Sequence, residues 1–144
     1  MTRVFDFLQL TQAFATVATV IYVFLTWQQL KLLRKQATTT FEDSLTEQYR
    51  RIIENIPIEI WLGVDLRTLD EVRRNRCRDA ICRYIDLSND QAFLHNKKRV
   101  TDEAWNQWSD GIKLNMKLGA FAEVWEEVKK KCPASFNELR GVLA

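Results

Sequence analysis

The most apolar part of the chain lies close to its N-terminus. From Phe7 to Leu30, 24 consecutive residues carry no charge, between Asp6 and Lys31. As a helix rising about 1.5 Å per residue, this run is about 36 Å long, and a bilayer's hydrocarbon core is about 30 Å thick. A cleaved signal peptide would have a shorter apolar region followed by small residues, which are missing here. The pattern therefore predicts an uncleaved transmembrane helix.

Six polar side chains interrupt this apolar run at intervals of three or four residues, which places them along one side of a helix. They are Gln9, Gln12, Thr16, Thr19, Tyr22 and Thr26. Because amide groups are costly in hydrocarbon, we expect this polar stripe to face copies of the same helix or water. Three interpretations stay open: a helix–helix seam in a dimer or trimer, the lining of a water-filled pore, or an incidental feature of a weakly hydrophobic anchor.

The charges that flank the run predict its orientation. Lys31, Arg34 and Lys35 follow it, whereas Arg3 alone precedes it. The positive-inside rule then places the N-terminus outside and the C-terminal part in the cytoplasm. The expected location is the bacterial inner membrane. We assign residues 1–36 to a transmembrane anchor with a juxtamembrane helix, and residues 37–144 to a cytosolic helical domain.

Apolar residues in the remaining chain recur at helical spacing, and no strand pattern competes with it. We expect a stop at Thr38–Thr40, a helix from Phe41 to Ile56 that ends before Pro57, and a long helix from about Leu69 to Phe93. Its expected buried residues are Val72, Cys77, Ala80, Ile81, Tyr84 and Ile85. Thr101 should cap a helix whose inner stripe consists of Trp105, Trp108 and Ile112. Gly119 should separate this helix from the next, which carries Phe121, Val124, Trp125 and Val128. Ser135–Glu138 should form a capping box. The predicted fold class is all-α, with a single N-terminal transmembrane helix followed by a compact cytosolic helical bundle.

Composition narrows the chemistry. With 21 basic and 19 acidic residues, the net charge of +2 gives no general attraction to nucleic acid. Cys77, Cys82 and Cys132 form an odd set without C-x-x-C spacing, so we expect core thiols in a reducing cytosol. With a single histidine, His95, no zinc module fits, and no metal or other cofactor is expected.

Five arginines cluster in the predicted long helix, and Arg73, Arg76 and Arg83 are the candidates for subunit or ligand contacts. Guanidinium groups suit phosphates, so a nucleotide messenger is one candidate ligand. Pairs of Asp70 with Arg74 and of Asp79 with Arg83 would neutralise part of the cluster. Because no aromatic residues are interleaved for base stacking, nucleic acid is not the expected partner.

His95 is the one residue to weigh as a general acid or base. Some helical ribonuclease domains carry an arginine, then four to six residues, then a histidine. At those offsets this chain has Ser88, Asn89 and Asp90 instead. We therefore expect no catalytic residue and no enzyme, and keep His95 as a candidate ligand or subunit contact.

Several segments resemble a family of uncharacterised bacterial proteins with one N-terminal membrane helix and a helical cytosolic domain of unknown function. They are Arg83–Leu94, Val100–Ile112, Ala120–Trp125 and Phe136–Leu139. The overall plan, with its broken ribonuclease motif, is also similar to small membrane accessory proteins of CRISPR systems, in which several copies form a membrane pore that supports antiphage defence.

Together these features predict a homo-oligomeric membrane effector whose pore depolarises the inner membrane in antiphage defence. Its expected partners are the lipid bilayer, copies of itself, and a defence-system protein or nucleotide messenger. One alternative is a membrane-tethered interaction or sensor module without a channel. Another is a divergent helical domain that binds nucleic acid or a nucleotide through His95 and the arginine-rich helix.

Overall fold

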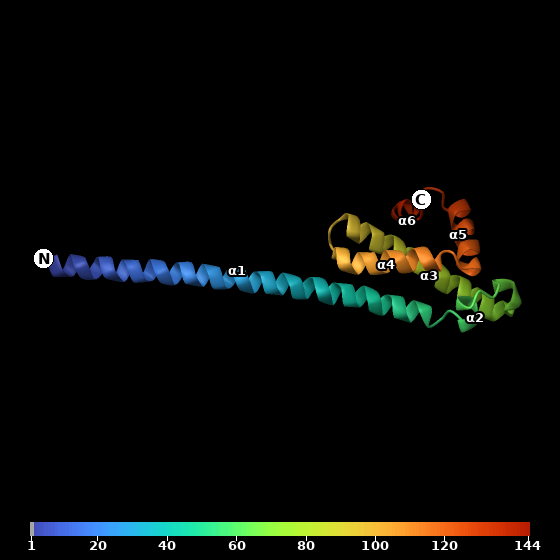
Figure 1. Cartoon of the computed structure of the whole chain (residues 1–144), viewed down its shortest axis with the longest axis horizontal. Coiled ribbons are helices and arrows are strands. Elements are labelled where there is room, and N and C mark those ends of the chain that lie inside the picture. Colours follow the sequence, from blue (N-terminus) through green and yellow to red (C-terminus); the bar gives the residue numbers. More distant parts are fainter. Residues whose placement is uncertain (1) are drawn as a thin grey trace. The chain divides into compact units, whose positions relative to one another are not determined.

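The computed structural model describes the backbone of residues 2–144 and the side chains of residues 12–144, and every regular element in these residues is helical (Figure 1). The elements are α1 (Thr2–Ile53), α2 (Ile58–Trp61), the 3-10 helix η1 (Leu66–Thr68), α3 (Glu71–Asn96), α4 (Asp102–Asn115), α5 (Gly119–Lys131) and α6 (Asn137–Leu143). The all-α prediction is confirmed for these residues. The chain divides into two compact units, Met1–Thr39 and Thr40–Ala144, each described by itself.

The first unit consists of the N-terminal part of α1. Within Gln12–Ile53, an 18-residue window reaches a mean hydropathy of 1.4, and none of that window is buried. Phe14, for example, is 70% exposed. The helix is therefore long and apolar enough to cross a membrane, and the absence of burial in these described residues separates it from the core helix of a water-soluble protein.

The expected helix end at Thr38–Thr40 is wrong, because α1 runs through these residues to Ile53. The hydroxyl groups of Thr38 and Thr39 donate to the carbonyl oxygens of Arg34 and Lys35, both at 3.1 Å. A threonine bonded to the preceding turn does not compete for the helix's own N–H groups, so the helix continues. The helix ends only shortly before Pro57, which disfavours the helical conformation in the residue that precedes it.

The second unit is built around α3, which contacts α4, α5 and α6. Its main core includes Ile81, Ile85, Phe121 and Leu139, all without exposed surface, and a smaller cluster surrounds Leu45. Burying such aliphatic and aromatic groups stabilises the fold by roughly 1.5–3 kcal/mol each. This core holds the helices of the unit together.

Five of the six residues expected to be buried in α3 are indeed buried, namely Cys77, Ala80, Ile81, Tyr84 and Ile85. Val72 is the exception at 69% exposure. It lies in the first turn of the helix, whereas Cys77 is the first residue of α3 that is buried. Helical spacing predicts which side of a helix faces the core, but not how far the covering elements extend along it.

The helix caps agree with the sequence at one end of the unit and differ at another. Thr101 caps α4, since its hydroxyl accepts a hydrogen bond from the Ala104 N–H at 3.2 Å. The expected capping box at Ser135–Glu138 is wrong. Phe136 instead takes the N-cap position of α6 in a left-handed conformation, φ 60°, without a side-chain cap. Its ring packs against Trp125 with a centroid separation of 6.3 Å, so tertiary packing offsets the strain.

The three cysteines occupy different environments. Cys77 is buried as expected, and its burial raises the pKa of the thiol to about 11. Cys82 and Cys132 are exposed, so the prediction of core thiols is wrong for both. Cys82 lies on α3 outside its buried face, and Cys132 is the C-cap residue of α5.

Candidate functional site

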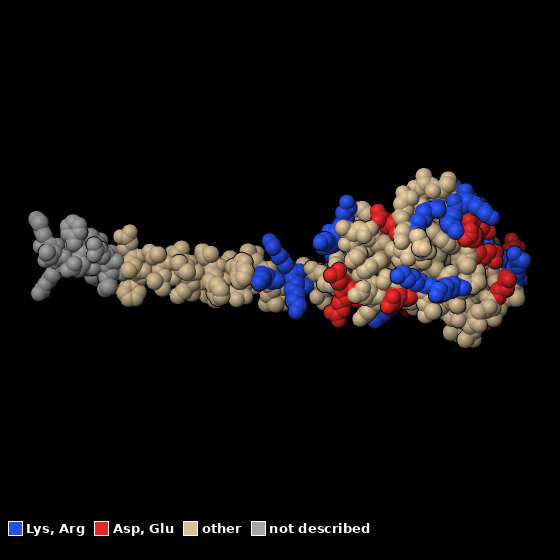
Figure 2. Space-filling view, turned by 45° about the horizontal axis from the view of Figure 1, so that its top comes forward, with Lys and Arg blue, Asp and Glu red and all other residues tan. Residues whose placement is uncertain are grey.

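The polar stripe of α1 is exposed at four of its five described positions: Gln12, Thr16, Thr19 and Tyr22, with Thr26 half-buried. The side chain of the sixth member, Gln9, lies outside the described residues. Figure 2 shows this part of the helix as a continuous surface without charged residues, followed by a basic cluster.

The threonines of the stripe need no partner from outside their own helix. The hydroxyl groups of Thr16, Thr19 and Thr26 donate to the carbonyl oxygens four residues earlier, at 2.9, 2.8 and 2.8 Å. In contrast, no hydrogen bond joins the side chain of Gln12 or Tyr22 to another residue with a described side chain. The energetic demand for a partner in the membrane is therefore concentrated in the amide and phenol groups of the stripe.

An aromatic and cationic group follows the apolar stretch. The Lys31 ammonium lies 4.2 Å from the centroid of the Trp27 ring, and the Phe24 ring lies 6.2 Å from that of Trp27. Trp rings and basic side chains are both favoured where hydrocarbon gives way to headgroups. This arrangement fits one boundary of a membrane span.

The three predicted arginines lie together beside the C-terminal end of α1. Arg76 and Arg83 line a pocket of about 160 Å³, and Arg73 and Arg76 line a second pocket of about 230 Å³. The two pockets share Arg76 and Asn55, and Arg51 contributes a further cation to the first. We call this surface the arginine groove.

Most of the positive charge in the arginine groove is neutralised. Arg73 pairs with Glu59 at 2.9 Å, and the expected pair of Arg83 with Asp79 forms at 3.0 Å. The pKa of Glu59 lies below its ordinary value, first because its carboxylate accepts a backbone N–H and second because of Arg73, whose own pKa is raised by this carboxylate. Arg76 alone has no ion pair with another described residue. The groove is therefore better suited to a charged protein contact than to a free phosphate.

The expected pair of Asp70 with Arg74 is wrong. The Asp70 carboxylate caps α3 instead, accepting the Arg73 N–H at 2.9 Å. Such a cap satisfies a backbone donor that no residue within the helix can reach, which favours it over an exposed ion pair.

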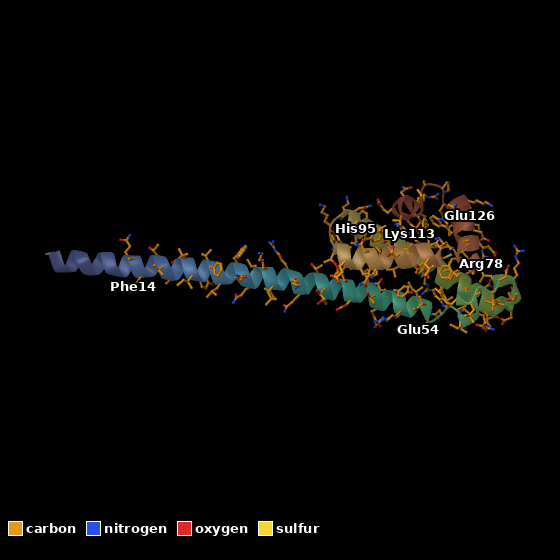
Figure 3. All side chains as sticks on the ribbon, in the orientation of Figure 1. Phe14, Glu54, Arg78, His95, Lys113 and Glu126 are labelled. Carbon is orange, nitrogen blue, oxygen red and sulfur yellow. The ribbon has the colours of Figure 1, made fainter. Side chains whose placement is uncertain are left out.

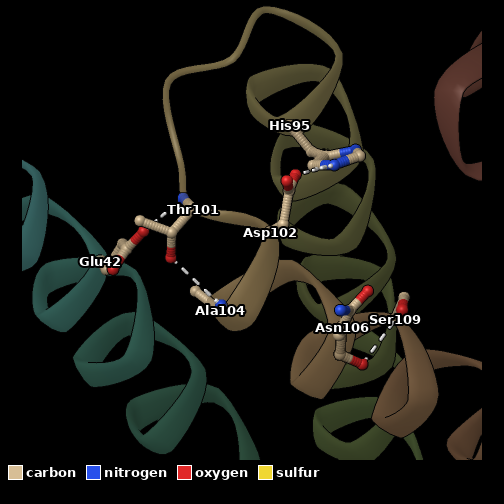
Figure 4. Close-up of polar contacts among 7 residues, drawn as sticks. All are labelled: Glu42, His95, Thr101, Asp102, Ala104, Asn106 and Ser109. Carbon is tan, nitrogen blue, oxygen red and sulfur yellow. Dashed lines mark hydrogen bonds and ion pairs between the residues drawn. The ribbon is translucent and has the colours of Figure 1, made fainter.

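His95 lies near the other end of α3 from the arginine groove. It follows Arg83 by twelve residues, or about 18 Å of helix. Its half-buried ring stacks on Trp105 with a centroid distance of 4.8 Å and an interplanar angle of 11°, and its Nε2 lies 3.3 Å from an Asp102 carboxylate oxygen (Figure 4). The sequence candidates are thus divided between two regions of the unit.

The residues around His95 make contacts that connect helices. Thr101, one residue before Asp102, donates its backbone N–H to the Glu42 carboxylate at 2.6 Å (Figure 4). His95 and Ser109 line one pocket, in which the Ser109 hydroxyl donates to the Asn106 carbonyl oxygen at 3.2 Å. Lys113, labelled with His95 in Figure 3, lines the same pocket. The Ser109 hydroxyl is bonded to a backbone carbonyl oxygen and not to His95, so the pocket shows no nucleophile paired with a base. The contacts of Thr101 and Asp102 hold the start of α4 against α1 and α3.

No group of three His, Cys, Asp or Glu side chains within the described part of the chain could hold a metal ion. Reasoning from sequence missed Glu59 as the partner of Arg73, because the two are 14 residues apart and belong to different helices. It also missed Arg51, which lies on α1. No periodicity along one helix can signal such contacts.

Comparison with known proteins adds no family to this geometry. No family model matches the chain, no curated protein matches it, and no solved structure matches it. What the protein does must therefore be argued from its own residues.

Proposed function

We propose that the protein is a homo-oligomeric effector of the bacterial inner membrane. The apolar part of α1 spans the bilayer, residues 40–144 lie in the cytoplasm, and the spans of several copies associate through the polar stripe. The assembled stripes enclose a water-filled path whose opening depolarises the membrane. The observation that carries the proposal is the Gln12 amide, which is exposed in an apolar helix without a hydrogen-bond partner among the described side chains.

An amide in hydrocarbon without a hydrogen bond costs roughly 2–7 kcal/mol, and no described side chain of the same helix bonds to that of Gln12. Amide and hydroxyl groups of neighbouring helices supply bonds worth about 0.6–2 kcal/mol each, and water in a central path supplies them as well. Gln9 precedes Gln12 by three residues in the sequence, and this spacing predicts that the two amides act together.

The second candidate is a membrane-tethered interaction module without a channel. It is favoured by the threonines, whose hydroxyl groups are satisfied by their own helix and can face lipid at little cost. In this candidate, Gln9 and Gln12 form a local dry seam in a dimer. The arginine groove would then be the surface that contacts a partner protein.

Replacement of both Gln9 and Gln12 by Leu tests the two candidates. We expect this variant to lose the depolarisation of vesicles that the wild-type chain causes, and to dissociate into smaller particles in detergent. The matched control is Gln28→Leu, which removes an amide from roughly the opposite side of the helix and should change neither measurement.

Two readouts separate the outcomes: dye-reported potential across the vesicle membrane, and the mass of the detergent-extracted particle. A large ring that depolarises vesicles only with its amides intact supports the pore. A wild-type dimer, or depolarisation that persists in the double variant, contradicts it. If the protein is a tethered module, replacing residues 7–30 by an unrelated anchor should preserve its effect in the cell.

The setting of this activity is proposed from the likeness to CRISPR accessory proteins. Loss of membrane potential halts phage production in a cell, so expression of the chain together with a CRISPR system should reduce plaque formation. The Gln9→Leu, Gln12→Leu variant should restore it. Equal plaque counts with and without the wild-type chain would contradict the role in defence and leave the channel activity to be judged on vesicles.

A further inference from the structure

We infer that the second unit contains a binding pocket for a neutral nucleobase or nucleoside, formed by α3, α4 and the residues of α1 from Thr40 onward. Its volume is about 270 Å³. Three aromatic residues line it, Tyr49, Tyr84 and Trp108, together with three amides, Gln91, Gln107 and Asn115. The pocket is distinct from the polar stripe and shares no residue with the arginine groove.

Gln91 is the residue that marks this pocket as a site. The residue is 5% exposed, and no hydrogen bond joins its amide to another described residue. No fully buried side-chain nitrogen or oxygen among the described residues lacks a partner, so the unpaired amide of Gln91 is accessible from the pocket that it lines. The amide is therefore within reach of a molecule that enters the pocket. A ligand in the pocket would satisfy both the donor and the acceptor of this amide.

The neighbouring polar groups are already arranged. The Asn115 amide nitrogen donates to the Tyr84 hydroxyl oxygen at 3.0 Å, which leaves the Asn115 carbonyl oxygen available to a ligand. Burial raises the pKa of Tyr84 to about 12, so the phenol stays neutral at physiological pH. The ring of Tyr84 is itself fixed by edge contact with Phe121 at a centroid distance of 5.3 Å. This part of the pocket is therefore preorganised.

The lining indicates the class of ligand. All the residues that line the pocket are uncharged, so a phosphate or carboxylate placed there would have no counter-charge. Asn and Gln side chains match the adjacent donor and acceptor on the edge of a nucleobase, and aromatic faces stack on its plane. A neutral, planar heterocycle with such an edge satisfies both features, whereas a purely apolar ligand would leave Gln91 unpaired.

Calorimetric titration of the full chain in detergent tests the assignment, with adenosine, guanosine, cytidine and uridine as ligands. At least one should bind saturably, and adenosine 5′-monophosphate should bind no more tightly than adenosine. Gln91→Leu, which keeps the volume and removes the amide, should weaken binding about tenfold or more. Its melting temperature should stay close to that of the wild type, because the replacement breaks no hydrogen bond to another described residue.

A second variant occludes the pocket without touching its polar groups. A Cβ atom added at Gly111 would meet nothing within 4 Å, so the side chain of Gly111→Leu can enter the pocket and should abolish nucleoside binding. Gly141→Leu is the matched control, since this helical glycine of α6 is equally free of neighbours and does not line the pocket. It should bind as the wild type does.

Three results would overturn the assignment. The first is no saturable binding of any of the four nucleosides to the wild-type chain. The second is binding that neither Gln91→Leu nor Gly111→Leu weakens. The third is at least tenfold tighter binding of the monophosphate, which would indicate a phosphate site elsewhere on the chain. The wild-type titration alone decides the first and third, so these hold even if a variant fails to fold.

Discussion

At the scale of single residues, Tyr84 belongs both to the core of the second unit and to the lining of its pocket. It is 3% exposed, its ring contacts Phe121 edge-on, and its hydroxyl accepts the Asn115 amide. Desolvation is the main reason that its pKa rises to about 12. The folded protein therefore disfavours tyrosinate much more strongly than the unfolded chain does.

This shift predicts a loss of stability at high pH. The folded-state pKa of Tyr84 is above the unfolded value, so the unfolded chain releases this proton first as the pH rises. The associated stability is complete below about pH 10 and is lost as the pH rises toward 12, by about 1 kcal/mol at pH 11. Chemical denaturation at pH 8, 10 and 11 measures it, and Tyr84→Phe should reduce the decrease between pH 10 and 11.

Tyr22→Phe serves as the control for that series, because Tyr22 is exposed and lies in the other unit. Its denaturation curve at pH 8 should match that of the wild type. An equal decrease in the wild type and in Tyr84→Phe would mean that Tyr84 is not responsible. Cys77, whose thiol is also shifted upward by burial, would then be the next group to replace.

At the scale of elements, the start of α4 is held by contacts to two other helices. Thr101 caps the helix through its hydroxyl, and its backbone N–H binds Glu42 on α1. Asp102 and Glu103 in the first turn suit the positive end of the helix dipole, and Asp102 also contacts His95. This one turn therefore connects α4 to both α1 and α3.

Thr101→Ala should lower the free energy of unfolding by about 1 kcal/mol, because the Ala104 N–H loses its acceptor. Thr101→Ser retains a hydroxyl in the same place and should recover most of the loss. Both variants keep the backbone bond to Glu42. Urea denaturation monitored by tryptophan fluorescence provides the measurement, and equal midpoints for Thr101→Ala and the wild type would show that the cap contributes nothing.

At the scale of the whole molecule, the chain joins an uncovered apolar helix to a unit with its own core. The basic residues Lys31, Arg34 and Lys35 follow the apolar stretch, and Lys31 lies over Trp27. If the positive-inside rule acts on them, everything from Thr40 onward is cytoplasmic. The exposed thiols of Cys82 and Cys132 allow the side of the membrane to be tested by labelling, without introducing new cysteines.

A membrane-impermeant maleimide should therefore leave Cys82 and Cys132 unlabelled in intact spheroplasts and label them after permeabilisation. Replacing Lys31, Arg34 and Lys35 with Gln should expose these thiols in part of the population, because the charge bias that sets the orientation is lost. The Cys82→Ser, Cys132→Ser variant is the labelling control. Full labelling of intact spheroplasts would place the second unit outside.

Local patterns in the sequence were enough to predict most of the helices. An uninterrupted run without charge can only satisfy its backbone in lipid as a helix, so the apolar part of α1 follows from composition alone. Spacing placed Ile81 and Ile85 in the core, and a threonine before two acidic residues identified the start of α4. These features depend on a residue and its neighbours within two turns, and the sequence contains that information directly.

The remaining features required the tertiary structure. The pairing of Arg73 with Glu59, the exposure of Val72 and the left-handed Phe136 depend on where one element ends against another. The pocket around Gln91 takes its lining from three helices, and no periodicity within α3 indicates that the Gln91 amide lines it. A pattern along one helix predicts which side is apolar, whereas the partner of each side chain is decided only when separate helices meet.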